Sequence, residues 1–206
     1  MGVHSGPNIV RSNLTVSLDS RNRKSFLGDN FYNLTNLQNL GNPSWSNSAS
    51  ELTVILIIKI LGSNTEYAYH PVNKWNSGTN DASFVFYHFQ NYLGTNPQNE
   101  NLLGWYANAG GAWQGLSGQY KASQNTSYFV ALQYSSQSGG QLWINNSKVG
   151  SRTGSGVLGS GSSDILIDGN VTGRSNIHKV EMLKFYNKDL SDSQILSMYD
   201  LFKNRL

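Results

Sequence analysis

The chain contains no cysteine, so disulfide bonds and thiolate metal sites are both excluded. Charged residues are scarce as well: they make up 13% of the 206 residues, about half the usual share. The longest apolar run, residues 52–61, is too short to cross a bilayer and contains Lys59. These absences exclude a disulfide-stapled scaffold and a transmembrane helix.

Motifs for phosphate chemistry and for serine hydrolysis are also absent. The sequence has neither a Gly-Lys-Ser/Thr phosphate loop nor a Gly-x-Ser-x-Gly elbow. The net charge is +3, but the 15 Lys and Arg are scattered, and the densest group is only Arg21, Arg23 and Lys24. Nucleic-acid binding needs a concentrated positive surface, so we expect no nucleic-acid partner. Residues 1–7 do not begin a charged region followed by an apolar stretch, so we expect no secretory signal.

What the sequence does contain is typical of β-structure. Hydrophobic residues make up 38% and aromatic residues 12%, enough to fill one interior, and the length suits a single domain over residues 1–206. Alternating or short apolar segments bounded by turn residues predict strands. The expected strands are residues 14–18, 52–60, 66–70, 83–89, 102–107, 127–134, 141–144, 147–149, 164–167 and 178–186. Residues 52–60 are the most apolar and should be buried on both faces.

Loops and one helix complete this expectation. Residues 145–146, two asparagines, predict a tight turn, and the Gly/Ser-rich residues 150–163 predict a flexible loop. Ser191 and Gln194 form a capping-box pattern, with Leu190 placed to staple against the following helix. One face of that helix is apolar, consisting of Ile195, Met198, Tyr199 and Phe202. The sequence therefore predicts an all-β, two-sheet antiparallel jelly-roll sandwich with one short C-terminal helix.

Three segments carry a resemblance to a known family. Residues 6–10 (GPNIV) followed by 14–19 (LTVSLD) resemble the opening of laminin-G-like jelly rolls, which belong to the concanavalin A-like lectin and glucanase superfamily. Residues 141–149 (QLWINNSKV) are similar to an internal hairpin of that family, and residues 180–196 (VEMLKFYNKDLSDSQIL) to its closing segment. The resemblance implies two packed antiparallel sheets, one of which often serves as a carbohydrate platform. It also implies that structural calcium could be present, but no residue here matches the family's calcium ligands.

Hydrolysis of a glycan would require a pair of carboxylates. The pair must lie about 5–5.5 Å apart in retaining glycosidases and about 6.5–9.5 Å apart in inverting ones. The nearest approach in sequence is Asp164 and Asp168, which would lie about 13 Å apart on a regular strand. Carboxylates distant in sequence could still meet in space, so a glycanase of the same fold stays open as a third alternative.

The four histidines, His4, His70, His88 and His178, are far apart in the sequence. They could form a metal site only by long-range convergence, so we expect histidines at the surface or at the rim of the sheets and assign no metal ligands. No catalytic residues are assigned either.

Aromatic residues are the better candidates for a site, because aromatic rings hold the C–H faces of sugars while Asn and backbone groups bind hydroxyls. Two tryptophans flank a Gly-rich turn, and two tyrosines share one face of an expected strand, with Trp75 expected on the loop that follows. The predicted glycan-binding residues are Trp105, Tyr106, Asn108, Trp113, Tyr67 and Tyr69. The alternative for each ring is a place in the core, which is the expectation for Trp143.

Together these features predict a non-enzymatic structural protein of the bacteriophage virion, either a capsid decoration protein or a fibre component. It would contact other virion proteins, could bind host-surface glycans, and could form a homo-oligomer. Laminin-G-like jelly rolls with such an opening segment occur in many bacteriophage and large-virus proteins, so the resemblance implies a location in the virion, and the absence of a secretory signal agrees with release by lysis. A free-standing carbohydrate-binding lectin is the alternative. We expect no membrane partner.

Overall fold

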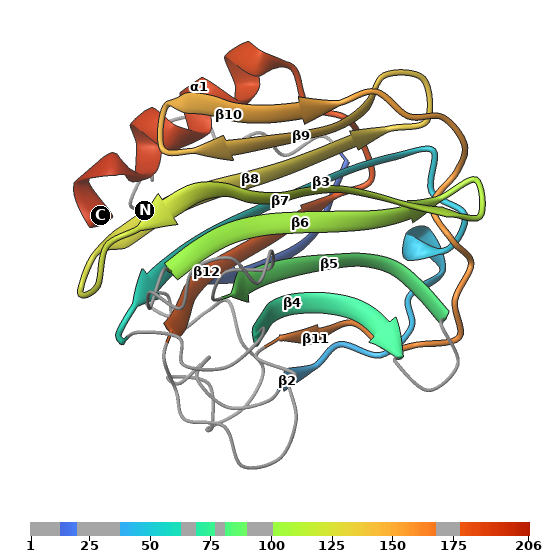
Figure 1. Ribbon diagram of the computed structural model, residues 1–206, viewed down its shortest axis with the longest axis horizontal. Coiled ribbons are helices and arrows are strands. Elements are labelled where there is room, and N and C mark those ends of the chain that lie inside the picture. Colours follow the sequence, from blue (N-terminus) through green and yellow to red (C-terminus); the bar gives the residue numbers. More distant parts are fainter. Residues whose placement is uncertain (1–12, 20–37, 63–68, 77–80, 90–100, 168–177) are drawn as a thin grey trace, which may run out of the picture.

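The computed structural model describes residues 13–19, 38–62, 69–76, 81–89, 101–167 and 178–206, which form two antiparallel sheets and a C-terminal helix (Figure 1). In the first sheet the strands lie in the order β1 (Leu14–Asp19), β12 (His178–Tyr186), β3 (Glu51–Ile60), β8 (Ser127–Ser135), β9 (Gly139–Ile144) and β10 (Ser147–Arg152). In the second sheet the order is β2 (Gln38–Asn39), β11 (Leu166–Ile167), β4 (Tyr69–Asn76), β5 (Asp81–Phe89), β6 (Asn101–Ala109) and β7 (Ala112–Ala122). The predicted fold class is confirmed.

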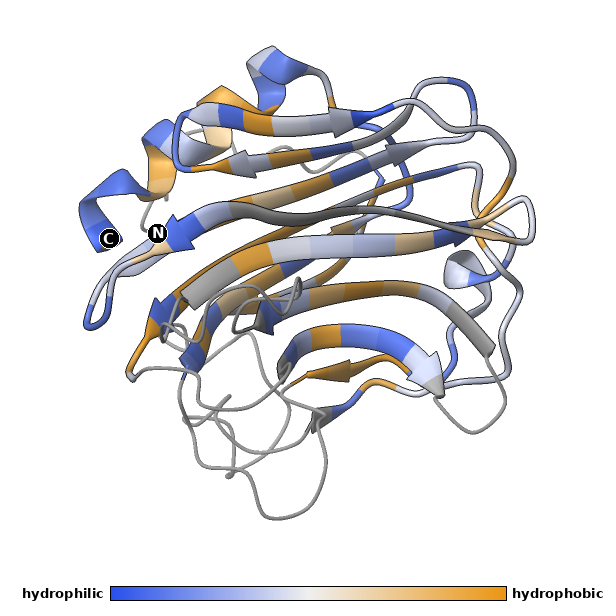
Figure 2. Cartoon of the chain, viewed as in Figure 1, coloured by the Kyte–Doolittle hydropathy of each residue, from blue (hydrophilic) through white to orange (hydrophobic). Residues whose placement is uncertain are grey.

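The central strand β3 is buried on both faces, as predicted. It lies between β12 and β8, so its backbone is paired on both sides. Five of its side chains face the second sheet and form the core between the sheets: Leu52, Val54, Leu56, Ile58 and Ile60. Ile55 and Ile57 face the opposite way and belong to a second core cluster under the helix. Because each fully buried Leu or Ile contributes about 1.5–3 kcal/mol, this strand stabilises both core clusters. Figure 2 shows hydrophobic segments, in orange, on strands of both sheets.

Helix α1 (Asp192–Phe202) covers the outer face of the first sheet. The predicted capping box is confirmed: the Gln194 backbone N–H donates to Ser191 Oγ at 3.3 Å, and the Ser191 backbone N–H donates to Gln194 Oε1 at 2.9 Å. Ile195, Met198 and Phe202 are buried against the sheet, in one cluster with Leu190. No described helix is long and apolar enough to cross a membrane.

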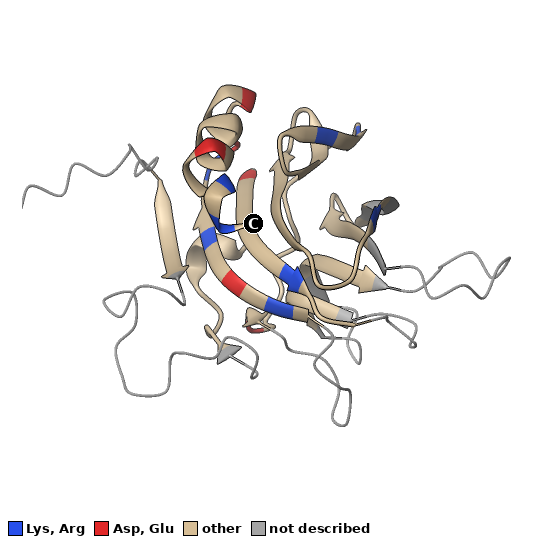
Figure 3. Ribbon diagram, turned by 90° about the vertical axis from the view of Figure 1, so that its left-hand side faces the viewer, with Lys and Arg blue, Asp and Glu red and all other residues tan. Residues whose placement is uncertain are grey.

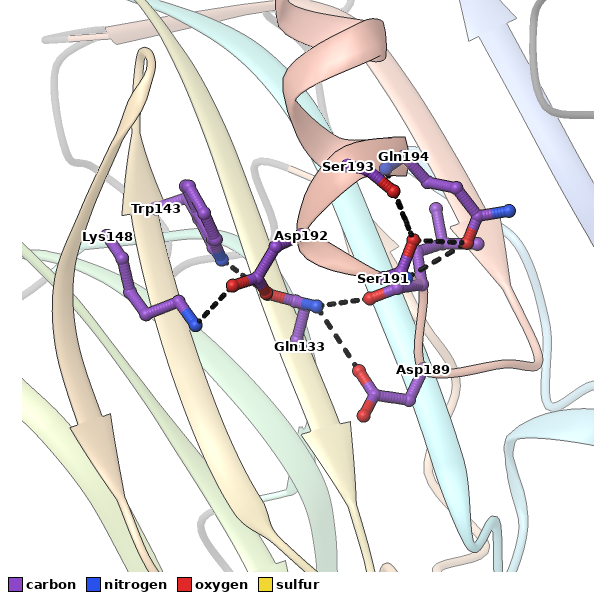
Figure 4. A network of polar contacts seen from close by, with 9 residues as sticks. Gln133, Trp143, Lys148, Asp189, Ser191, Asp192, Ser193 and Gln194 are labelled. Atoms are coloured by element: carbon purple, nitrogen blue, oxygen red, sulfur yellow. Dashed lines mark hydrogen bonds and ion pairs between the residues drawn. The ribbon is translucent and has the colours of Figure 1, made fainter.

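A polar network fastens the start of this helix to the first sheet (Figure 4). Gln133 of β8 accepts a hydrogen bond from the Trp143 indole N–H and donates to the Leu190 carbonyl and to Asp189 Oδ1. Lys148 of β10 forms an ion pair with Asp192 at 2.9 Å. Trp143 is buried, as predicted, but on the helix side of the first sheet rather than between the sheets.

The carboxyl of Asp189, in this network, has a pKa raised above the ordinary value. Burial raises its pKa, as do the charges of Glu51 and Asp192, while the Gln133 hydrogen bond and Lys148 act in the opposite direction. A raised carboxyl pKa in the folded state stabilises the fold below the ordinary carboxyl pKa, and this contribution is lost as pH rises through the folded pKa. Ionised Asp189 therefore lowers stability at neutral pH.

We expect Asp189→Asn to raise the melting temperature at neutral pH, because the amide oxygen can still accept from Gln133 without carrying a buried charge. The gain should shrink as the solution is acidified and disappear below about pH 4, where the wild-type carboxyl is protonated. Melting curves of both proteins from about pH 3 to about pH 8 measure this. If Asp189→Asn raises the melting temperature by the same amount at every pH, the stability change does not come from ionisation of Asp189.

Three sequence expectations need correction. Trp75 lies within β4 and not on a following loop, since β4 continues to Asn76. Strand β7 was not predicted, although Gly110 and Gly111, with φ of 58° and 78°, form the tight turn that leads into it from β6. The expected loop 150–163 is not free: β10 continues to Arg152, and Leu158 is buried and donates its backbone N–H to the Ala49 carbonyl at 2.9 Å. Residues 6–10 of the N-terminal resemblance lie outside the described residues.

Candidate functional site

Trp105 and Tyr106 are consecutive residues of β6 that point to opposite faces of the second sheet. Trp105 is 3% exposed and belongs to the core between the sheets, where its ring meets Tyr134 at 6.3 Å. A Cβ added at Gly140 of β9 would lie 2.3 Å from the Trp105 ring, so the ring lies directly over that glycine. The prediction that Trp105 binds a glycan is therefore wrong, because strand alternation turns its ring inward.

Tyr106 lies on the outer face of the second sheet and is partly exposed. Its backbone pairs with Gly115 of β7, and a Cβ added at Gly115 would lie 2.1 Å from the Tyr106 ring. The absence of a side chain at Gly115 thus lets the Tyr106 ring lie against the neighbouring strand. Two glycines, Gly140 of the opposite sheet and Gly115 of the neighbouring strand, thus accommodate two successive aromatic rings.

The other predicted site residues are placed only in part. Asn108 shares the face of Tyr106 by strand alternation, is partly exposed, and pairs through its backbone with Trp113. Tyr69 begins β4, opposite His88. The side chains of Trp113 and Tyr69 and the whole of Tyr67 lie outside the described part of the structure. Of the predicted residues, the structure therefore places Tyr106 and Asn108, both partly exposed, on the outer face of the second sheet.

Three further aromatic side chains continue from Tyr106 across the outer face. Tyr87 of β5 meets the Tyr106 ring edge to face at 5.1 Å, and His70 of β4 meets Tyr87 at 4.8 Å. Trp75 of β4 meets His70 at 5.0 Å. We call His70, Trp75, Tyr87 and Tyr106 the aromatic row. His70 is buried, whereas the other three rings are partly exposed and could contact a ligand.

The aromatic row ends at a cation. Arg152 of β10 is exposed and crosses from the edge of the first sheet to the edge of the second, where its Nη1 donates to the Gly115 carbonyl at 3.4 Å. Gly115 is the residue against which the Tyr106 ring lies. The guanidinium and the last ring of the row therefore share one backbone neighbour.

Carboxylates are almost absent from this sheet. Among the described strands of the second sheet, Asp81, the first residue of β5, is the sole Asp or Glu. Most of the ribbon is uncharged, as Figure 3 shows. Glycoside hydrolysis normally needs two carboxylates within about 10 Å of each other. The described part of the outer face offers rings and a cation but no such pair, so its chemistry suits binding.

The three described histidines are buried, so the surface half of the expectation is wrong, but each lies at or next to the end of its strand, as expected for the rim of a sheet. His70, His88 and His178 are at most 6% exposed. His88 and His178 meet edge to face at 5.7 Å between the two sheets, one from each sheet. Within the described residues no three His, Cys, Asp or Glu side chains are grouped to hold a metal ion.

Comparison with known proteins identifies structural but no sequence relatives. No protein-family model matches the chain, and no curated protein does. The receptor-binding domain of botulinum neurotoxin D aligns with a TM-score of 0.62 and 17% identity over 91% of this chain and 52% of that one. The receptor-binding domain of botulinum neurotoxin type G aligns with a TM-score of 0.60 and 14% identity over 92% and 51%. A Trypanosoma rangeli sialidase aligns with a TM-score of 0.51 and 10% identity over 76% and 23%.

These matches define the class of the fold, a lectin-like β-sandwich. This chain spans about half the length of the two toxin domains and about a quarter of the sialidase chain. At such identities the likeness concerns the fold alone. What the chain binds must be argued from its own residues.

Proposed function

We propose that this chain is a non-catalytic carbohydrate-binding domain that holds sugars on the outer face of its second sheet. The observation that carries the proposal is the aromatic row, in which Trp75, Tyr87 and Tyr106 present partly exposed rings from three adjacent strands. Rings of this kind stack on the C–H faces of sugars, and a small number of polar groups nearby fix the orientation. The known receptor-binding domains of the same fold support a binding role over an enzymatic one.

Removal of one ring tests this proposal. We expect Tyr106→Ala to weaken binding of any saccharide found on a glycan array by about tenfold, because one stacking contact is lost. Tyr87→Ala should act in the same direction. The stability of both variants should change little, because both rings are partly exposed and lie outside the buried core.

The matched control is Tyr199→Ala. Tyr199 is also partly buried, but its ring meets Phe129 at 5.8 Å beneath the helix, on the far side of the first sheet. Saccharide binding by folded Tyr199→Ala should equal that of the wild type. If Tyr199→Ala weakens binding as much as Tyr106→Ala, the outer face of the second sheet is not the binding surface.

We propose further that the domain is part of a bacteriophage virion, as a capsid decoration or fibre component that contacts host-surface glycans. This location rests on the resemblance of residues 14–19, 141–149 and 180–196 to segments of bacteriophage and large-virus proteins. Mass spectrometry of purified particles should detect the protein in constant ratio to the major capsid protein. Its absence from particles, combined with saccharide binding, would favour the free-standing lectin instead. Hydrolysis of a polysaccharide that one carboxylate substitution abolishes would favour a glycanase.

A further inference from the structure

Arg152, the cation at the end of the aromatic row, is not held in an ion pair with a described residue, whereas three other described cations are. Lys148 forms an ion pair with Asp192, and Lys203 with Asp200 at 3.0 Å. Lys179 lies 3.9 Å from Glu181. Arg152, by contrast, has the Gly115 carbonyl as its polar contact, and no described carboxylate lies within ion-pair distance of it. Its guanidinium therefore keeps most of its five N–H donors for an external acceptor.

The backbone that carries Arg152 is held in place by close packing. Arg152 pairs with Gly140, the glycine that lies under the buried Trp105 ring. A Cβ added at the neighbouring Gly139 would lie 2.1 Å from the Arg152 carbonyl oxygen, and Gly139 has a φ of +85°. This close approach of the Arg152 backbone is possible because Gly139 has no side chain, while Gly140 leaves room for the Trp105 ring. The arginine is thus presented from a fixed backbone position beside Tyr106.

The surroundings of Arg152 favour an anionic ligand. The described strands of the second sheet carry a single carboxylate, Asp81, at the start of β5, and the chain as a whole has a net charge of +3. A negatively charged group that approaches the end of the row therefore meets the Arg152 guanidinium, and the described strands of this sheet hold no carboxylate but Asp81 to compete with it.

We infer that the aromatic row binds a carboxylate-bearing saccharide, with a sugar ring against Tyr106 and the carboxylate on the Arg152 guanidinium. This inference rests on the proposed carbohydrate-binding function and adds the chemical class of the sugar. A guanidinium presents parallel N–H donors that match the two oxygens of a carboxylate, which gives the contact directionality as well as charge. Tyr106 and Arg152 share Gly115 as a neighbour, so one acidic sugar residue can contact both.

Two matched pairs of saccharides test the inference. In the first pair, sialyllactose carries the carboxylate that its methyl ester lacks; in the second, a galacturonate oligomer carries the carboxylates that its methyl ester lacks. We expect the acidic member of at least one pair to bind about tenfold more tightly than the neutral member. Arg152→Gln should remove this difference while leaving the affinity for the neutral member unchanged. Added salt should weaken binding of the acidic member alone.

The control variant is Lys203→Gln, which removes one positive charge at the far side of the molecule, next to helix α1. It should leave the preference intact. If the wild type binds the acidic and the neutral members equally, the inference is overturned and the proposed function still stands. The same conclusion follows if Arg152→Gln still prefers the acidic member. Tighter binding of a sulfated galactoside than of both carboxylates would also overturn it. Failure to bind all four probes and a broad array of neutral glycans would contradict both proposals.

Discussion

Replacement of Trp105 by alanine is expected to lower the free energy of unfolding by about 3–5 kcal/mol. The indole lies in the core between the sheets, 3% exposed, over Gly140 and against Tyr134. No described neighbour can fill the space readily, because the opposing residue Gly140 has no side chain to move. Urea denaturation followed by circular dichroism measures the loss.

The neighbouring residue provides the control for this experiment. Tyr106→Ala, one position along the same strand, should cost about 1 kcal/mol or less, because its ring is partly exposed. The two substitutions should therefore separate stability from binding: the first affects the fold, and the second affects saccharide affinity. A stable Trp105→Ala protein that no longer binds saccharide would instead restore Trp105 as a ligand-binding residue.

Replacement of Gln133 by methionine is expected to cost about 2–4 kcal/mol, although the two side chains have similar volumes. Gln133 is 2% exposed, and it accepts from the Trp143 indole N–H while donating to the Leu190 carbonyl. Methionine can satisfy neither group, so a buried donor and a buried acceptor lose their partners at the start of helix α1. In hydrogen exchange, Gln133→Met should speed the exchange of backbone amides, relative to the wild type, more in residues 190–202 than in β3.

Gln137→Met is the matched control for the Gln133 variant. Gln137 lies exposed in the turn between β8 and β9, so the same change of side chain should alter the free energy of unfolding by about 0.5 kcal/mol or less. If both variants are equally stable, the network at the foot of the helix does not hold the helix on the sheet.

The sequence predicted correctly those strands and the helix whose own residue pattern matches the way in which they are packed in the fold. Residues 52–60 are apolar at every position but Thr53 and Lys59, which fits a strand covered on both faces, and the structure covers them with the second sheet and with α1. Ser191 and Gln194 interact within three residues, so their pattern fixed the start of the helix without reference to the rest of the chain. Strand β7 escaped prediction because its segment is rich in Gly, Ser and Gln and has no clear alternation.

The candidate site was predicted only in part for a related reason. Alternation in β6 separates Trp105 from Tyr106, but periodicity alone does not tell which face of a strand is buried, and both rings were assigned to the ligand. The aromatic row depends on pairing between β4, β5 and β6, and the register shifts in β4 between Tyr69 and Val72 and between Lys74 and Trp75. Those irregularities bring His70 and Trp75 to the same face as Tyr87, and nothing in the linear sequence marks them. Arg152 reaches the row from the other sheet, which only the folded structure shows.

The most direct test of the central claim, that the outer face of the second sheet binds carbohydrate, is a nitrogen–proton NMR titration that follows the indole signals. The protein would be titrated with the saccharide that it binds most tightly on a glycan array, and each tryptophan signal assigned by substitution. The proposed site predicts that the signal of Trp75, in the aromatic row, moves with saccharide concentration while those of the core residues Trp105 and Trp143 stay in place. Saturable binding that leaves the Trp75 signal unmoved, or that shifts the Trp143 signal beneath the helix instead, would contradict it.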